Sequence, residues 1–237
     1  MKRILALVLC IVSLSASARD LTKALTAETQ ANLTPTEVIQ LLKDGNERFL
    51  QNEPVERNFL RQVEQTSEGQ YPMAAVLGCI DSRVPHEIVF DKGVGDIFSV
   101  RVAGNFVNTD ILGSLEFATA VAGSKVVVVL GHSECGAIKG VCDRVEVGNL
   151  TSTLANLAPA LYAVGHRHEN ISASNKALVK EVAHANVEMT VKNIVDRSPV
   201  MRELVEAGKL IVIGAMHDVR TGRIEFFEDS MISAESI

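Results

Sequence analysis

Two short motifs, each placed directly after an apolar run, constrain the fold of this chain more than any other feature. Cys79-x-Asp81-x-Arg83 follows the run 73–77, and His132-x-x-Cys135 follows the run 125–130. Thiolates and imidazoles are the ligands that tetrahedral zinc prefers. A fold that joins the two motifs supplies two thiolates and one imidazole and leaves a fourth position open for water. Three protein ligands are typical of catalytic zinc sites, because structural sites are usually closed by a fourth Cys or His.

Apolar runs alternate with helical patterns along the chain. We predict buried strands over 73–77, 97–102, 125–130 and 210–213, and a short edge strand over 223–227. Helical spacing predicts helices over 36–50, 110–121, 150–164 and 175–195, the second of them capped by Asp110. This alternation favours an α/β fold with a mostly parallel central sheet that helices flank on both faces. Cys79 and His132 then follow the C-terminal ends of parallel strands, where open α/β sheets gather their ligands.

The first 18 residues have the three parts of a secretory signal peptide. Lys2 and Arg3 form a short basic start, residues 4–14 are apolar, and Ala16-Ser17-Ala18 is a small-x-small cleavage signal. The alternatives are a membrane anchor or a buried helix, but the apolar run is too short to span a bilayer comfortably. We therefore predict cleavage after Ala18 and export to the periplasm or the extracellular space. Residues 19–237 are then long enough for a single domain with one sizeable core.

The charge of the chain bears on its partners. Removal of Lys2 and Arg3 would change the formal net charge from −6 to about −8. An acidic chain lacks the basic footprint that nucleic-acid phosphates require. Nothing in residues 19–237 resembles a membrane span, so we expect neither a nucleic-acid partner nor a membrane partner after cleavage.

Cysteine usage leaves two interpretations open. Cys10 lies in the predicted signal peptide, and Cys79, Cys135 and Cys142 remain. In an oxidising compartment three cysteines suggest one disulfide and a spare thiol. Cys79 and Cys135, however, belong to compact motifs with Asp, Arg and His that a disulfide does not need. We therefore favour a metal site over a disulfide, with Cys142 as a packed free thiol.

Asp81 and Arg83 suggest how a metal-bound water would be oriented. An Arg beside an Asp keeps the carboxylate ionised and fixes its direction. An ionised Asp81 can accept a hydrogen bond from a water on zinc, which itself lowers the pKa of that water to about 7. An ordinary salt bridge is the alternative, and the neighbouring Cys79 argues against it. We therefore expect Asp81 and Arg83 to be catalytic.

At this point the motifs identify a family. Residues 79–83 (CIDSR) and 131–136 (GHSECG) resemble the zinc signature of the β-class carbonic anhydrases, with supporting similarity at 45–49 (GNERF) and 101–105 (RVAGN). The resemblance covers almost all of residues 19–237. It implies a zinc enzyme, with one Zn²⁺ per subunit, that hydrates carbon dioxide to bicarbonate and a proton by attack of zinc-bound hydroxide. It also implies an N-terminal helical arm and assembly into homodimers, which can pair into tetramers.

The resemblance extends to the substrate pocket. Gln70 matches a glutamine that donates to a substrate oxygen, Phe98 matches an aromatic wall, and Phe117 stands where many relatives have Tyr. In dimers of the family Gln70 and Phe117 would come from the neighbouring subunit. The backbone N–H of Gly136 is a further candidate donor to bicarbonate, although glycine at a turn also has a purely conformational explanation.

Some relatives have an inactive closed form, in which the residue matching Asp81 becomes the fourth zinc ligand. Relatives with a bicarbonate-operated switch carry a Trp, and this chain has none. We therefore expect the open form at neutral pH. Fast turnover also requires a proton carrier, and His217, after the run 210–213, is one candidate.

Two other functions are compatible with the same motifs. One is hydrolysis of carbon disulfide or carbonyl sulfide by a similar zinc centre with a different entrance channel. The other is a non-enzymatic zinc-binding or storage module, which would gain nothing from Asp81 and Arg83.

Overall fold

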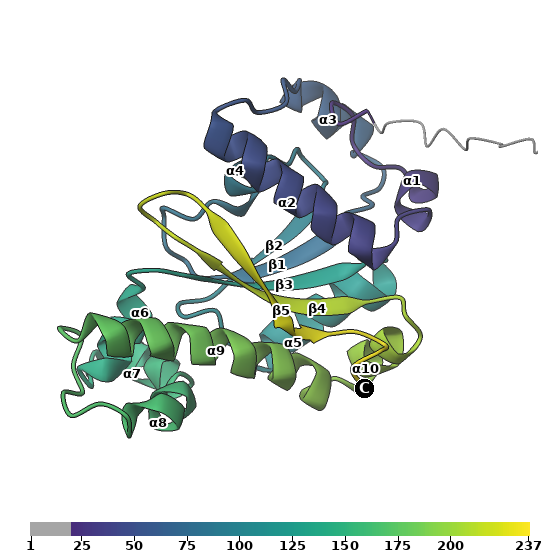
Figure 1. The fold of residues 1–237 in the computed structure, drawn as a ribbon. Helices are drawn as coiled ribbons and strands as arrows, with labels where there is room; N and C mark the ends of the chain where they lie inside the picture. Colours follow the sequence, from purple (N-terminus) through teal and green to yellow (C-terminus); the bar gives the residue numbers. More distant parts are fainter. Residues whose placement is uncertain (1–19) are drawn as a thin grey trace, which may run out of the picture.

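The computed structural model describes residues 20–237, so the predicted signal peptide and Cys10 lie outside the described residues. Its centre is a five-stranded sheet in the order β2-β1-β3-β4-β5 (Figure 1). The first four strands pair in parallel, and β5 pairs with β4 in the antiparallel direction. The strands are β1 (Ala74–Gly78), β2 (Ile97–Arg101), β3 (Val126–His132), β4 (Ile211–His217) and β5 (Ile224–Ile232). The predicted α/β class, the strands and the C-terminal edge strand are confirmed.

Helices cover both faces of this sheet. They are α1 (Ala27–Ala31), α2 (Pro35–Gln51), α3 (Phe59–Gln65), α4 (His86–Val89), α5 (Thr109–Glu116), the π-helix η1 (Phe117–Val121), α6 (Gly136–Cys142), α7 (Gly148–Ala155), α8 (Ala158–Gly165), α9 (Lys176–Arg197) and α10 (Pro199–Glu206). In the helix that was predicted over 36–50, Thr34 and Glu37 form a capping box, and Pro35 occupies the first turn. Both features favour a helix start there.

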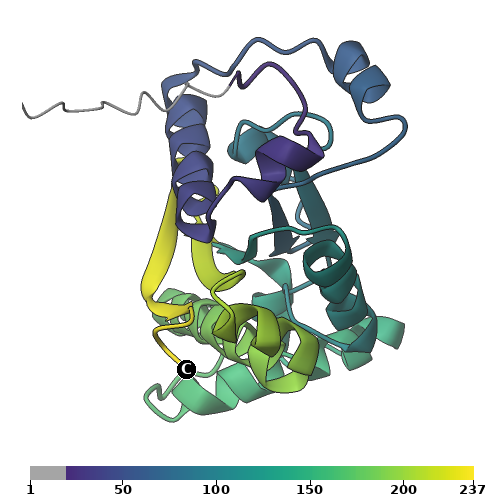
Figure 2. The same ribbon diagram turned by 90° about the vertical axis from the view of Figure 1, so that its right-hand side faces the viewer.

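Alternate side chains of the central strands pack into two different apolar layers. Ala74 and Val76 face the layer that α2 covers, whereas Ala75 and Leu77 face the layer formed with α5, α9 and α10. Figure 1 shows α2 and α9 on opposite sides of the sheet, and Figure 2 shows the yellow strand β5 at one edge. Every residue of β1 and β3 is buried, which explains why both segments read as continuous apolar runs.

Two glycines on neighbouring strands allow α9 to approach the sheet closely. A Cβ at Gly131 of β3 would lie 2.6 Å from Val187 Cγ2, and a Cβ at Gly214 of β4 would lie 2.7 Å from Val187 Cγ1. Both distances are too short for carbon atoms in contact. Val187 of α9 therefore fills the space that these two missing side chains leave.

The structure corrects two predicted helices. The pattern over 150–164 is not one helix but two, α7 and α8, because Pro159 lies in the first turn of a new helix, where it needs no backbone N–H. The helix expected over 110–121 begins earlier, since the Asn108 side chain accepts the capping hydrogen bond from Ile111. Asp110 is in its first turn and is not the cap. The last part of this segment, from Phe117, is a π-helix.

The search for membrane-spanning helices covered residues 20–237. Within them, none of the helices combines the length and the hydropathy that crossing a bilayer requires.

Replacement of Gly214 by Ala should lower the free energy of unfolding by about 1–3 kcal/mol, because the added methyl group meets Val187. The double variant with Val187→Ala should lose less than the sum of the two single changes, since the smaller side chain makes room. Urea unfolding of the two single variants and the double variant measures this coupling. Strictly additive losses would mean that Val187 does not limit the approach.

Candidate metal centre

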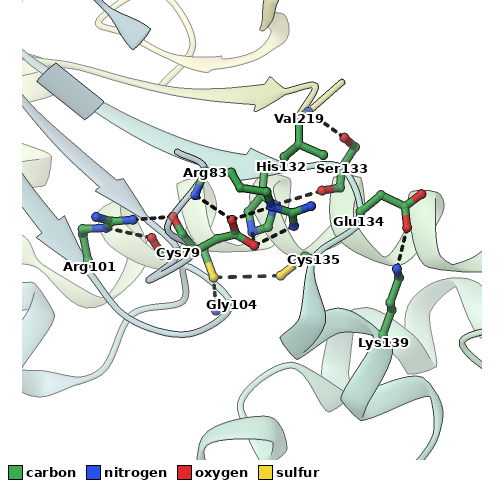
Figure 3. A network of polar contacts seen from close by, with 11 residues as sticks. Cys79, Arg83, Arg101, Gly104, His132, Ser133, Glu134, Cys135, Lys139 and Val219 are labelled. Atoms are coloured by element: carbon green, nitrogen blue, oxygen red, sulfur yellow. Dashed lines mark hydrogen bonds and ion pairs between the residues drawn. The ribbon is translucent and has the colours of Figure 1, made fainter. Parts of the chain in front are cut away.

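Cys79, His132 and Cys135 converge at the C-terminal edge of the parallel strands (Figure 3). Their Sγ and imidazole nitrogen atoms all lie within 4.8 Å of one another, and the two Sγ atoms are 4.0 Å apart. All three residues are buried. The structure therefore brings together the three ligands that the two motifs predict.

The sheet explains this convergence. Because β1 and β3 are adjacent and parallel, with Gly78 opposite Leu130, the chain leaves both strands at the same edge. Cys79 directly follows β1, and His132 is the last residue of β3. Between His132 and Cys135, Glu134 adopts a left-handed backbone conformation with φ of 58°, which lets the short loop turn back before α6 begins.

The His132 ring is arranged as a metal ligand. Its Nδ1 lies 2.9 Å from the carbonyl oxygen of Ser133, which requires the proton on Nδ1 and leaves a lone pair on Nε2. Nε2 is buried and has no hydrogen-bond partner within residues 20–237. This buried nitrogen acceptor faces two thiols and lacks a protein partner. A zinc ion bound between the three residues would be a suitable partner for it.

The two thiols interact strongly. A hydrogen bond from Cys135 is the main cause that lowers the pKa of Cys79 to about 4, and the N–H of Gly104 also donates to Cys79 Sγ at 3.4 Å. The same hydrogen bond, together with burial, raises the pKa of Cys135. Two neighbouring thiolates repel each other unless a cation lies between them, so the donor set suits a divalent metal. Cys79, Cys135 and Cys142 are all free thiols, as the metal-site interpretation requires.

Asp81 is held beside this centre by Arg83. Arg83 Nε donates to Oδ1 at 2.9 Å, and Nη2 donates to Oδ2 at 2.8 Å. This paired contact is the main cause that lowers the pKa of Asp81, so the carboxylate is ionised. Oδ2 also lies 3.9 Å from His132 Nε2. The salt bridge therefore presents an oriented negative charge to the ligand cluster, which an ordinary surface pair would not do.

A supporting set of residues was not assigned from the sequence. Arg101 Nε donates to the carbonyl oxygen of Cys79 at 2.9 Å, and its Nη2 donates to that of Asp81 at 2.6 Å. Gly104 has φ of 85°, which favours glycine, and its carbonyl oxygen accepts from the buried Asn186 side chain at 2.8 Å. These residues hold the loop after β1 in place. The sequence did contain a signal for Arg101 and Gly104, because segment 101–105 is part of the family resemblance. That resemblance assigned no role to these residues.

The predicted substrate residues Gln70, Phe98 and Phe117 do not join the cluster of their own chain. Gln70 is exposed before β1, so the full strand, roughly 16 Å, separates it from the ligands. Phe98 pairs with Ala75, near the start of β1. Its ring packs edge-to-face against Phe117 at 6.1 Å, and both rings line a surface groove of about 570 Å³.

Gly136 and His217 differ in their access to solvent. Gly136 is exposed at the start of α6, and a Cβ added to it would meet nothing within 4 Å. Its N–H is one of the unpaired donors of a helix start. His217 lies opposite His132 in the sheet and is 3% exposed, and burial is the main cause that lowers its pKa to about 4. This environment does not suit a proton carrier that exchanges with solvent.

Three buried metal donors with a charged pair beside them, at the C-terminal edge of a parallel sheet, define a catalytic metalloenzyme site. A family model described as carbonic anhydrase matches residues 74–224. Carbonic anhydrase 2 of Mycobacterium tuberculosis is 33% identical over 200 residues, which are 81% of this chain and 92% of the relative. A carbonic anhydrase of Pseudomonas aeruginosa is 33% identical over 164 residues, which are 66% of this chain and 73% of that relative.

Solved structures agree with this match. A β-carbonic anhydrase from Sordaria macrospora, described as tetrameric, superposes with a TM-score of 0.62 at 28% identity, over 71% of this chain and 90% of that one. CafA, a β-carbonic anhydrase of Aspergillus fumigatus, shares the fold with a TM-score of 0.65 at 23% identity, over 81% of this chain and 90% of that one. The chain belongs to the β-class carbonic anhydrase family. It is an enzyme, and its reaction is the reversible hydration of carbon dioxide.

The zinc content of purified variants tests the ligand set. Cys135→Ala should lose most of its zinc, because it removes one of the three donors. Cys142→Ala, which removes a buried thiol outside the cluster, should retain about one zinc per chain. Metal analysis by mass spectrometry distinguishes the two. Equal zinc loss in both variants would contradict the assignment.

Proposed function

We propose that this enzyme hydrates carbon dioxide at one zinc ion per subunit, held by Cys79, His132 and Cys135. The observation that carries the proposal is the Asp81–Arg83 pair, whose carboxylate faces His132 Nε2 at 3.9 Å. Zinc, when bound, supplies a water whose pKa is low enough for hydroxide to form near neutral pH. The remaining chemistry depends on how the surrounding residues orient that water and the substrate.

Asp81 is the orienting acceptor. Because both of its oxygen atoms accept from Arg83, the carboxylate is ionised and cannot donate a proton. It can therefore accept a hydrogen bond from the attacking oxygen nucleophile and so direct a lone pair of that oxygen toward the substrate. Arg83 holds the Asp81 carboxylate through two hydrogen bonds. This arrangement is expected for the open form, in which the carboxylate is not a metal ligand.

The substrate side of the site combines apolar surroundings with one backbone donor. Cys79 and Cys135 belong to an apolar cluster with Phe106, Ile138 and Leu157. A water-poor environment suits nonpolar carbon dioxide and strengthens electrostatic interactions at the centre. The N–H of Gly136, at the start of α6, is the donor that we propose for an oxygen atom of bicarbonate.

We further propose that a second subunit completes the pocket. Gln70 and Phe117 are both exposed and lie away from the ligands of their own chain. Several large apolar side chains are also exposed on the arm helix α3 and on η1, namely Phe59, Leu60, Val63 and Val121. Such surfaces commonly pack against a partner. A homodimer, or a pair of dimers, would cover them and bring Gln70 and Phe117 to the neighbouring centre.

The N-terminal sequence supports a proposal on location. Residues 1–18 have the pattern of a signal peptide, so we propose a periplasmic or extracellular enzyme, formed by residues 19–237. Neither a sulfide-hydrolysing enzyme nor a zinc-storage module is favoured, since the relatives named above are carbonic anhydrases.

Asp81→Asn should keep its zinc and lose at least about a hundredfold in the rate of hydration, because the neutral amide no longer orients the water by charge. Asp196→Asn, which changes an exposed carboxylate on α9, is the matched control. It should retain both its zinc and its rate of hydration. Stopped-flow hydration and zinc analysis of both variants make the comparison. Full activity of Asp81→Asn would refute the assigned role.

The oligomer proposal predicts that Leu60→Asp shifts the enzyme toward monomers and lowers its activity, because a charge replaces an apolar contact of α3. Tyr162→Asp, at an equally exposed position on α8, should leave at least the dimer intact. Sedimentation velocity measures the oligomeric state of both variants. An active monomer would rule out a contribution of Gln70 and Phe117 from a neighbour.

A further inference from the structure

A cleft of about 680 Å³ lies beside the loop that joins His132 to Cys135. Its walls come from the start of α9, from α6 and from the turn between β4 and β5. His132, Ser133 and Glu134 form part of its lining, whereas Cys79, Cys135, Asp81 and Arg83 do not. The cleft therefore borders the metal centre through His132, but it does not include the Asp81–Arg83 pair.

The rim of this cleft is rich in cations, although the chain as a whole has a formal net charge of −6. Lys176 and Lys180 lie one turn apart on α9, and neither forms an ion pair within residues 20–237. Arg223, on the opposite wall, has a single long ion pair of 3.9 Å with Glu47. Lys176 and Lys180 are thus available to bind an anion, and within the described part of the chain Arg223 is held only by this long ion pair.

Glu134 occupies part of the same cleft. Its carboxylate forms ion pairs with Lys139 and with Arg220, the latter at 3.3 Å. Glu134 therefore already neutralises two of the five cations in the lining, which also contains the carboxylates of Asp218 and Glu225. Glu134 should compete with any external anion for these two cations.

The floor of the cleft is apolar. Val179 and Ala183 are buried there, and Met216 lies beside them. The His184 ring stacks on Phe227, with centroids 4.9 Å apart and an interplanar angle of 20°. A cationic rim above an apolar floor fits a ligand that has both charge and an apolar body. Bicarbonate alone would leave most of the volume unfilled.

We infer that this cleft binds a small organic anion with two negative groups, carboxylates or phosphates, on an apolar or aromatic body. Lys176, Lys180 and Arg223 would bind the anionic groups, and the body would lie on Val179 and Ala183. The inference rests on the cations and the apolar residues of this cleft and not on the catalytic assignment, although His132 belongs to the same lining. It does place the ligand beside Glu134, which belongs to the loop that carries His132 and Cys135.

The test is calorimetric titration of the zinc-loaded protein with phthalate, a planar aromatic dicarboxylate, and with inorganic phosphate. We expect phthalate to bind more tightly than phosphate, because only phthalate covers the apolar floor. The double variant K176Q/K180Q should bind phthalate at least about tenfold more weakly. The control K192Q/K209Q removes two lysines outside the cleft, so it has the same net charge, and it should bind as the parent does.

Glu134→Gln supplies the opposite change. Loss of the internal carboxylate frees Lys139 and Arg220, so phthalate should bind severalfold more tightly. Zinc content and thermal unfolding of each variant confirm that it is folded and loaded. Absence of phthalate binding at 10 mM, on the order of the weakest useful affinity, would overturn the inference. Equal affinities of the two lysine double variants would also overturn it, since they would place the anion elsewhere, including at the metal.

Discussion

The structure depends on two buried sulfur atoms, 4.0 Å apart, and one imidazole nitrogen without a protein partner. The N–H of Gly104 donates to Cys79 Sγ, but residues 20–237 supply no cation between the two sulfur atoms. Burial and mutual repulsion oppose a second thiolate, and a buried nitrogen acceptor needs a donor or a cation. A single divalent ion bound to all three atoms would meet these demands. The donor set therefore suits a metal ion that stabilises this arrangement when it is bound.

The fold supplies the geometry for this ion through backbone interactions. The parallel pairing of β1 and β3 delivers the two motifs to one edge, and Arg101 and Gly104 fix the loop that carries Cys79. The N–H of Gly104 donates to Cys79 Sγ, and the carbonyl oxygen of Gly104 accepts a hydrogen bond from the Asn186 side chain of α9. A helix on one face of the sheet is thereby connected to the ligand cluster at its edge. The same helix contributes Lys176 and Lys180 to the cationic cleft.

Much of this could be predicted from the sequence, because buried parallel strands and zinc motifs leave direct signals in residue type. The strands and the ligand triad follow from such signals. The remainder depends on contacts that residue types do not encode. Pro159 is compatible with a helix start as well as with a break, so α7 and α8 were predicted as one helix. Asn108 and Asp110 can both cap a helix, and only the backbone path selects Asn108. Gly104 acts through its N–H group, and in the proposed dimer the position of Gln70 relative to a metal depends on a second subunit.

The central claim concerns the coordination of one zinc ion, and X-ray absorption at the zinc K-edge tests it most directly. The account predicts two sulfur ligands at about 2.3 Å and two nitrogen or oxygen ligands at about 2.0–2.2 Å, in the purified enzyme at neutral pH. The two nitrogen or oxygen ligands would be His132 and a water molecule. A spectrum with four sulfur ligands, or with none, would contradict the account.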